Sequence, residues 1–401
     1  MQRIRWWSAG VLSAAVGIAG CGGQDNTSAD GSLALSHQQG QQQGSFTKLP
    51  PNDKIFAFQT GAEIDWVPLN NAANAQHYVW LPAARKAKKR LFVFMPGTGN
   101  KPVDYQYFSG EAARAGYHVI GLMYRNDKAI ESVCPENRDP SKPPRAMSPD
   151  EDCSGKMRLE TLTGVDPPAD ISTDVTVSVA NSIDYRLTKL LVYLDGKSPH
   201  DGWSRFLKDG EPDWSRIAVG GQSQGAGQAA LIAQLRHVPR VVMLSGPPDS
   251  RRPNEMPPVV DNWIGIGRTP ASKHFALYHH QDGFVRGPPL GTTGITTNLT
   301  ALGLDRFGAP AAVGAEGPYC TDDDLGPRSD WSFGETRLLT TDLVPHDKDG
   351  CKGDTTGNPH RSTARDAYTP VTTDGTPRLL GAWRYMLGNS DEEDGQDAQD
   401  S

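Results

Sequence analysis

Five consecutive residues in the middle of the chain carry the strongest chemical signal. Gly221-Gln222-Ser223-Gln224-Gly225 matches G-x-S-x-G, with an apolar run of strand length before it and a helical pattern after it. A serine at the tip of a sharp strand-to-helix turn has a strained backbone, and the flanking glycines leave room for neighbouring strands. The pattern predicts that Ser223 is a nucleophile.

A nucleophilic serine needs a base, and the base needs an acid that orients it. With an elbow of this kind the acid and then the base follow the serine along the chain. Asp282 and Asp249 each follow an apolar run of strand length, and we favour Asp282 as the acid, with Asp249 as the alternative. The two histidines downstream of both acids are His346 and His360. Either is a candidate base from its position alone.

Attack on a carbonyl places negative charge on its oxygen, which requires fixed N–H donors. The backbone N–H of Gln224, next to the serine, is the first expected donor. The second is expected from the loop Pro96-Gly97-Thr98-Gly99-Asn100, whose small residues let the backbone approach a ligand. We therefore predict an oxyanion hole built from Gln224 and either Thr98 or Gly99.

Strand and helix patterns alternate along the chain, which predicts an α/β protein with a mostly parallel sheet and helices on both faces. The proline and glycine content, 31 and 43 residues, predicts many loops. The expected strands are residues 90–95, 117–124, 216–220, 240–244, 274–279 and 337–343. The expected helices are residues 103–115, 175–194, 224–235 and 382–387.

Residues 48–388 resemble the α/β-hydrolase superfamily, and more narrowly a poorly characterised group of exported bacterial serine hydrolases. The motifs that carry the resemblance are Met95-Pro96-Gly97-Thr98-Gly99, Gly221 to Gly227, His279-His280-Gln281-Asp282, His360-Arg361-Ser362-Thr363 and Trp383 to Leu387. The resemblance implies an α/β-hydrolase fold and the triad Ser223, Asp282 and His360, and it favours His360 over His346. Gln222 stands where esterases often have histidine, which leaves the polarity of the pocket open and does not disturb the triad.

The first residues are expected to be an export signal rather than part of the fold. In residues 1–20 two arginines precede a mostly apolar stretch that ends in small residues. Ile18-Ala19-Gly20-Cys21 resembles the lipobox of bacterial lipoproteins, which implies acylation of Cys21 and a lipid anchor in a membrane. Gly22 replaces the aspartate typical of inner-membrane retention signals, so the outer membrane or cell surface is favoured.

Two further segments are expected to lie outside the core. Residues 21–47 are rich in Gly, Ser, Gln and Asp, which is typical of a flexible tether. Residues 389–401 hold six acidic residues and no basic ones, which is typical of a disordered, solvated tail. The hydrolase domain is therefore expected to span residues 48–388.

The cysteines beyond Cys21 are even in number, which suggests disulfides in an exported chain. Proximity in the sequence favours Cys134 with Cys153 and Cys320 with Cys351, although four cysteines allow three connectivities. Zinc is the rival interpretation, but there is no CxxC pair to support it. We expect no metal and no cofactor.

The formal net charge of −7 provides no basic excess for binding phosphates, so nucleic acid is not expected as a partner. Together these observations predict an extracytoplasmic, lipid-anchored serine hydrolase that cleaves a small-molecule or polymeric carboxylic ester. The alternatives are an amide, thioester or polyester hydrolase or an acyltransferase on the same triad, or an inactive envelope-binding lipoprotein. The oligomeric state is not predicted.

Overall fold

The computed structural model describes residues 45–48, 76–83, 87–130, 153–166, 175–250, 259–286, 294–314, 333–345, 358–372 and 374–388. All of them belong to one unit, Gln42–Ser401. The predicted export signal, Cys21 and the acidic tail lie outside the described residues and stay predictions. Among the residues that the structure describes, no helix is long and apolar enough to span a membrane.

Nine of the described strands form one sheet in the order β1-β2-β4-β3-β7-β8-β9-β11-β10. β2 pairs antiparallel with β1 and β4, and the other pairings are parallel. The bounds are β1 Ser45–Lys48, β2 Tyr78–Leu81, β3 Leu91–Met95, β4 His118–Gly121, β7 Ile217–Gln222, β8 Val241–Leu244, β9 His274–His279, β10 Ala311–Val313 and β11 Leu338–Thr341. β5 (Leu207–Lys208) and β6 (Glu211–Pro212) form a separate hairpin.

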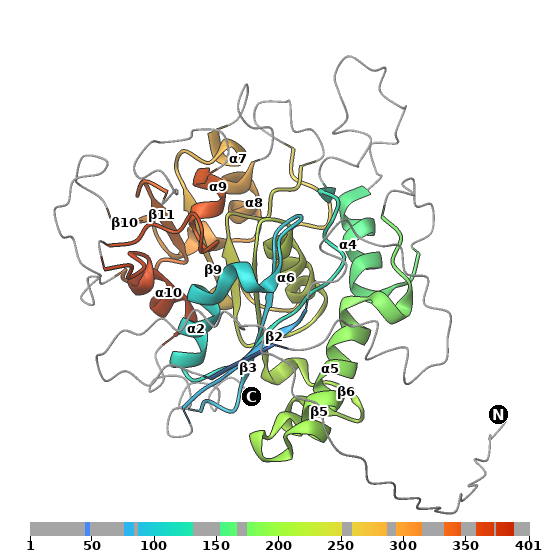
Figure 1. Cartoon of the computed structure of the whole chain (residues 1–401). Coiled ribbons are helices and arrows are strands. Elements are labelled where there is room, and N and C mark those ends of the chain that lie inside the picture. The colour runs from blue at the N-terminus through green and yellow to red at the C-terminus, as the bar shows by residue number, and fades with distance from the viewer. Residues whose placement is uncertain are drawn as a thin grey trace, which may run out of the picture. The chain divides into compact units, whose positions relative to one another are not determined.

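Helices cover both faces of the sheet (Figure 1). The α-helices are α2 Gln106–Arg114, α4 Cys153–Thr163, α5 Ile183–Lys197, α6 Gln224–Leu235, α7 Gly283–Arg286, α8 Ile295–Ala301, α9 Asn358–Ser362 and α10 Leu380–Leu387. The 3-10 turns are η2 Pro102–Tyr105, η4 Val179–Asn181, η5 Pro199–Asp201, η6 Trp203–Phe206, η7 Trp214–Arg216, η8 Ala271–Lys273 and η9 Leu304–Phe307.

The central strand β3 shows why the sheet is buried on both sides. Side chains alternate along a strand, so Leu91 and Val93 join the core under α5 and α6, whereas Phe92 and Phe94 join the core under α2 and α10. A strand that is buried on both faces has apolar residues at every position, and residues 91–95 show this pattern in the sequence. The parallel sheet with two helical layers confirms the predicted class, and with the elbow after β7 it is an α/β-hydrolase fold.

Several predicted boundaries were wrong. The helix expected over residues 103–115 is α2 over Gln106–Arg114, and the strand expected over residues 117–124 is β4 over His118–Gly121. The helix expected over residues 175–194 begins at Ile183, because the side chain of Ser182 caps it by accepting the backbone N–H of Tyr185. Val179, which the helical pattern had included, lies before that cap and is 52% exposed. Residues 45–47, expected in the tether, belong to β1, so the fold begins earlier than residue 48.

One of the cysteines lies within the described residues. Cys153 is disulfide-bonded at the first residue of α4. Cys134, Cys320 and Cys351 lie outside the described residues, so the predicted pairing of Cys134 with Cys153 and of Cys320 with Cys351 stays a prediction.

Buried neutral histidines make the fold sensitive to acid. His274, at the start of β9, is buried, and its Nδ1–H donates to the carbonyl of Pro270 over 3.0 Å. Loss of solvation lowers the pKa of His274 to about 4. Burial also lowers the pKa of His77 well below its ordinary value, and its Nδ1 accepts the N–H of Met123. The unfolded chain therefore binds protons that the folded chain excludes.

We predict that the free energy of unfolding falls as the pH drops from 6.5 to 4, because an unfolded histidine titrates near 6.5 and a folded His274 near 4. His274 accounts for about 3 kcal/mol of this loss at pH 4. Urea unfolding at several pH values measures it. His274→Asn keeps a donor for Pro270 without the titration, so its profile should be flatter than that of the wild type; parallel profiles would contradict the assignment.

Candidate active site

The nucleophile elbow lies between β7 and α6, as the sequence predicted. Ser223 adopts φ +55°, a left-handed conformation that side chains other than glycine rarely adopt. A Cβ at Gly225 would lie 1.9 Å from the carbonyl oxygen of Met95, and one at Gly221 would lie 2.5 Å from the backbone of Gly225. The strained turn thus requires glycine at both flanking positions, and it presses α6 against the end of β3.

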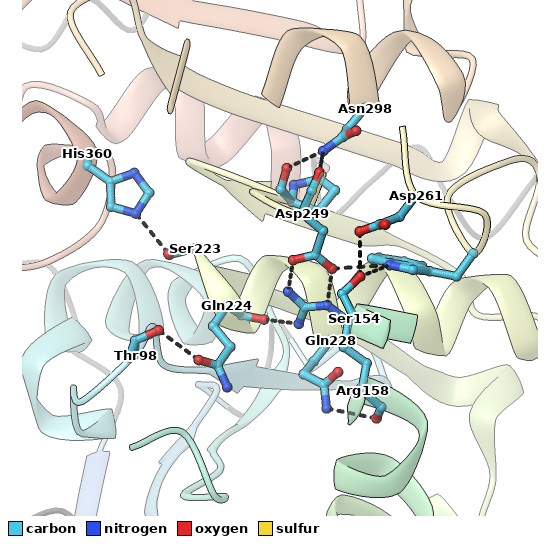
Figure 2. Close-up of polar contacts among 12 residues, drawn as sticks. Thr98, Ser154, Arg158, Ser223, Gln224, Gln228, Asp249, Asp261, Asn298 and His360 are labelled. Atoms are coloured by element: carbon cyan, nitrogen blue, oxygen red, sulfur yellow. Dashed lines mark hydrogen bonds and ion pairs between the residues drawn. The ribbon is translucent and has the colours of Figure 1, made fainter. Parts of the chain in front are cut away.

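Ser223, His360 and Asp282 form a continuous hydrogen-bonded chain. The Ser223 Oγ lies 2.8 Å from His360 Nε2 (Figure 2), and His360 Nδ1 lies 2.8 Å from Asp282 Oδ2. Because the carboxylate accepts, Nδ1 carries the hydrogen and Nε2 is left to accept the serine hydroxyl. Asp282 is fully buried, and its Oδ1 accepts the N–H of Phe284 over 2.9 Å. The Phe284 ring also packs against the imidazole, 4.5 Å between centroids.

These three side chains come from three segments that lie far apart in the chain. Ser223 follows β7, Asp282 follows β9, and His360 lies in α9, which follows β11 in the chain. The strands are parallel, so their carboxyl ends meet at the same edge. The order serine, acid and histidine that the sequence suggested therefore brings the three groups together in space.

The alternative acid does not reach a histidine. Asp249 is buried in an ion pair with Arg158, whose Nε and Nη2 each lie 2.5 Å from a carboxylate oxygen. That geometry assigns Asp249 a different partner and makes the alternative wrong. His346, the alternative base, lies outside the described residues.

The structure selects one of the two donors expected from the 96–100 loop. The N–H of Gly99 donates to the carbonyl of Asn126 over 2.8 Å, so the expectation that Gly99 stabilises an oxyanion was wrong. Within the described part of the chain, the N–H groups of Thr98 and Gln224 have no acceptor. Thr98 Oγ1 also donates to Gln224 Oε1 over 2.7 Å, which ties the two residues together (Figure 2).

Gln222 has a role that the sequence did not predict. Its Oε1 accepts the hydroxyl of Tyr105 over 3.0 Å, and its Nε2 donates to the backbone carbonyl of His360 over 2.9 Å. Tyr105 in turn accepts the N–H of Gly97 over 3.1 Å. Burial raises the pKa of Tyr105, which keeps its hydroxyl protonated. The amide thus links the loop of the oxyanion donor to the segment that carries the histidine.

The segment after His360 is anchored at two further points. The carboxylate of Asp366 accepts the N–H groups of Gln106 and Tyr107 at the start of α2, over 2.8 and 3.1 Å. Trp383 Nε1 of α10 donates to the carbonyl of Thr363 over 3.0 Å. The motif around Trp383 was part of the resemblance, but only the structure shows what its indole does.

Metal ligands do not gather anywhere in the described ranges. No group of three or more His, Cys, Asp or Glu side chains there is arranged to hold a metal ion. The chemistry that the described residues support is nucleophilic attack by Ser223, with His360 as base and two N–H donors for an oxyanion.

Comparison with known proteins gives no family. No protein-family model matches the chain, and no curated protein matches it. Among solved structures, a mutant of the esterase E40 has a TM-score of 0.32 at 14% identity, covering 87% of this chain and 86% of that one. MGS-M1, an alpha/beta hydrolase enzyme from a Medee basin deep-sea metagenome library, has a TM-score of 0.28 at 10% identity, covering 60% and 71%.

An esterase from the bacterial hormone-sensitive lipase family has a TM-score of 0.23 at 20% identity, and the alignment covers 51% of this chain and 44% of that one. TM-scores this low carry no argument about the site or its substrate. The fold assignment rests on the strand order and the elbow.

We predict that Gln222→Leu slows the reaction of Ser223 with a fluorophosphonate about 10-fold, because the carbonyl of His360 loses its tether and the base moves. Tyr105→Phe should act in the same direction and less strongly. Tyr385→Phe is the matched control, since it removes a hydroxyl that joins α10 to the backbone carbonyl of Thr336, just before β11. Equal rates for all three variants, at comparable melting temperatures, would refute the role assigned to Gln222.

Proposed function

We propose that this protein is a serine hydrolase that cleaves carboxylic esters through an acyl-enzyme. The observation that carries the proposal is the chain of 2.8 Å contacts from Ser223 Oγ through the His360 imidazole to the buried Asp282 carboxylate. The backbone N–H groups of Thr98 and Gln224, which have no acceptor among the described residues, support it.

In the first half-reaction, Ser223 Oγ attacks the ester carbonyl carbon while His360 Nε2 takes the hydroxyl proton. The carbonyl oxygen becomes an oxyanion that the N–H groups of Thr98 and Gln224 stabilise. Asp282 favours the imidazolium formed next to it, because the carboxylate is buried and already aligned with Nδ1–H. The tetrahedral intermediate then breaks the bond to the leaving alkoxide, which takes the proton from Nε2.

In the second half-reaction, water attacks the acyl-enzyme while His360 takes one of its protons. Collapse of the second oxyanion releases the carboxylic acid and returns the proton to Ser223 Oγ. The same groups act twice, and the chain ends in its starting protonation state.

The same constellation serves related reactions. An amide, a thioester or a polyester differs in the leaving group, and an acyltransferase replaces water by an alcohol in the second half-reaction. We propose the ester rather than the amide because an alkoxide leaves more readily than an amine, so this step demands less of His360 Nε2 as a proton donor. An inactive envelope-binding protein would not need Asp282, His360 and Ser223 in hydrogen-bonding sequence.

We predict that a fluorophosphonate labels the wild-type protein at one serine, and that Ser223→Ala abolishes labelling. Peptide mass mapping should place the label on the peptide that contains Ser223. The wild type should also hydrolyse p-nitrophenyl esters, and a parallel panel of anilides, thioesters and polyester films, with and without added alcohol, ranks the related reactions. A wild-type protein that is folded yet neither labelled nor active would sink the proposal.

We predict that Asp282→Asn lowers kcat for ester hydrolysis about 10³- to 10⁴-fold, because an amide neither fixes the tautomer of His360 nor stabilises its charge. Asp342→Asn is the matched control: Asp342 also lies beside a histidine nitrogen, His280 Nδ1 at 2.9 Å, but both side chains are about half exposed. Kinetics and melting curves of both variants check this. Similar kcat values would remove Asp282 from the mechanism.

A further inference from the structure

A buried ion pair lies next to the elbow and is not used by the reaction. Arg158 of α4 and Asp249, which follows β8, both have side chains that are 0% exposed. The guanidinium binds the carboxylate through two hydrogen bonds, Nε to Oδ2 and Nη2 to Oδ1, each 2.5 Å (Figure 2). Such a pair contributes little net stability, because both charges lose their hydration.

The third guanidinium nitrogen, Nη1, binds Gln224, the residue whose N–H is expected to donate to the oxyanion. Arg158 Nη1 donates to the backbone carbonyl of Gln224 over 2.9 Å (Figure 2). A Cβ at Gly227 would lie 2.3 Å from the guanidinium carbon, so glycine there makes room for the cation against the first turn of α6. The contact thus fixes the residue whose N–H faces a developing oxyanion.

Asp249 is itself held by two other residues, one on its carboxylate and one on its backbone. Trp263 Nε1 donates to Asp249 Oδ2 over 3.1 Å. Asn298 of α8 donates to the backbone carbonyls of Asp249 and Pro247 over 2.6 and 2.9 Å. The pair therefore connects α4, α8 and the segment after β8 to the start of α6, and a fixed carboxylate keeps the guanidinium fixed.

We propose that Arg158 is a positioning residue for the oxyanion hole, which rests on the proposed function. Thr98 holds the side chain of Gln224, and Arg158 holds its main chain. Together they fix the direction of the Gln224 N–H. Because Asp249 neutralises the guanidinium, its contribution is geometric: it acts on the step in which charge develops and not on the binding of the neutral ester.

The first test replaces both charges by Arg158→Leu/Asp249→Leu, which leaves no unpaired charge in the core. We predict that kcat for a p-nitrophenyl ester falls about 10- to 100-fold while KM changes less than about 2-fold. Affinity for a trifluoromethyl ketone, which forms an oxyanion on the enzyme, should fall by a similar factor. The midpoint of the pH profile of kcat should stay in place, because the triad is intact.

The matched control is Ser154→Ala. Ser154 lies in the same buried cluster, accepts Trp263 Nε1 over 3.0 Å and donates to Asp261, and none of its hydrogen bonds within the described residues goes to Gln224 (Figure 2). This variant should lower the melting temperature without the loss in kcat or in ketone affinity. If kcat falls in proportion to the loss in melting temperature, and does so equally in the leucine pair and in Ser154→Ala, the inference is overturned.

A second variant tests the same contact without removing either charge. Gly227→Ala places a methyl group where the guanidinium lies, so it should also lower kcat and ketone affinity. In the Arg158→Leu/Asp249→Leu background it should add little further loss, because the displaced group is already gone. If the leucine pair does not fold, Gly227→Ala carries the test alone.

The outcomes separate the two proposals. A wild type that fluorophosphonate does not label overturns the proposed function and this inference with it. A labelled wild type whose leucine pair or Gly227→Ala variant keeps full kcat and ketone affinity overturns the inference alone. If Gly227→Ala lowers kcat by the same factor in the wild-type and leucine-pair backgrounds, its methyl group does not act by displacing the guanidinium, and the inference is again overturned.

Discussion

The left-handed backbone of Ser223 is the constraint on which the site depends. A residue held at φ +55° persists only where the surrounding structure determines it, and here β7 and α6 meet at that residue. The turn is so tight that a Cβ at Gly225 would lie 1.9 Å from the carbonyl oxygen of Met95. This closeness brings the loop after β3 to the start of α6, so the strain that presents the hydroxyl also places Thr98 beside Gln224.

Two sets of buried polar contacts fix the groups on either side of that hydroxyl. On one side, Gln222 ties the carbonyl of His360 to Tyr105. On the other, Arg158 ties the carbonyl of Gln224 to Asp249. Each set joins residues that are more than 60 positions apart in the chain. Buried polar networks of this kind specify a geometry when every member is satisfied, which suits a site whose parts come from separate strand ends.

Structural features that a short stretch of sequence encodes were predicted correctly. Features that depend on a hydrogen-bond partner far away in the chain were not. Buried strands such as β3 read as apolar runs, and the elbow is a local motif. Helix α4 was missed because it buries polar groups, including Arg158, and so shows no apolar stripe. Gly99 was kept as a candidate oxyanion donor, because the sequence does not show that its N–H binds the carbonyl of Asn126, which lies on another loop. Gln222 was recognised as unusual, but its partners come from elsewhere in the chain.

The two aspartates show how environment separates residues that look alike in sequence. Both follow parallel strands of the sheet and both are fully buried. Asp249 faces a permanent cation in Arg158, so its charge is neutralised in the resting fold. Asp282 meets the His360 imidazole and the N–H of Phe284, and no arginine or lysine contacts it within the described residues. Its charge is thus available when the imidazole gains a proton. In the proposed reaction, the Asp282 carboxylate would stabilise a transient cation on His360, whereas the Asp249 carboxylate is already neutralised by Arg158 and fixes the position of that guanidinium.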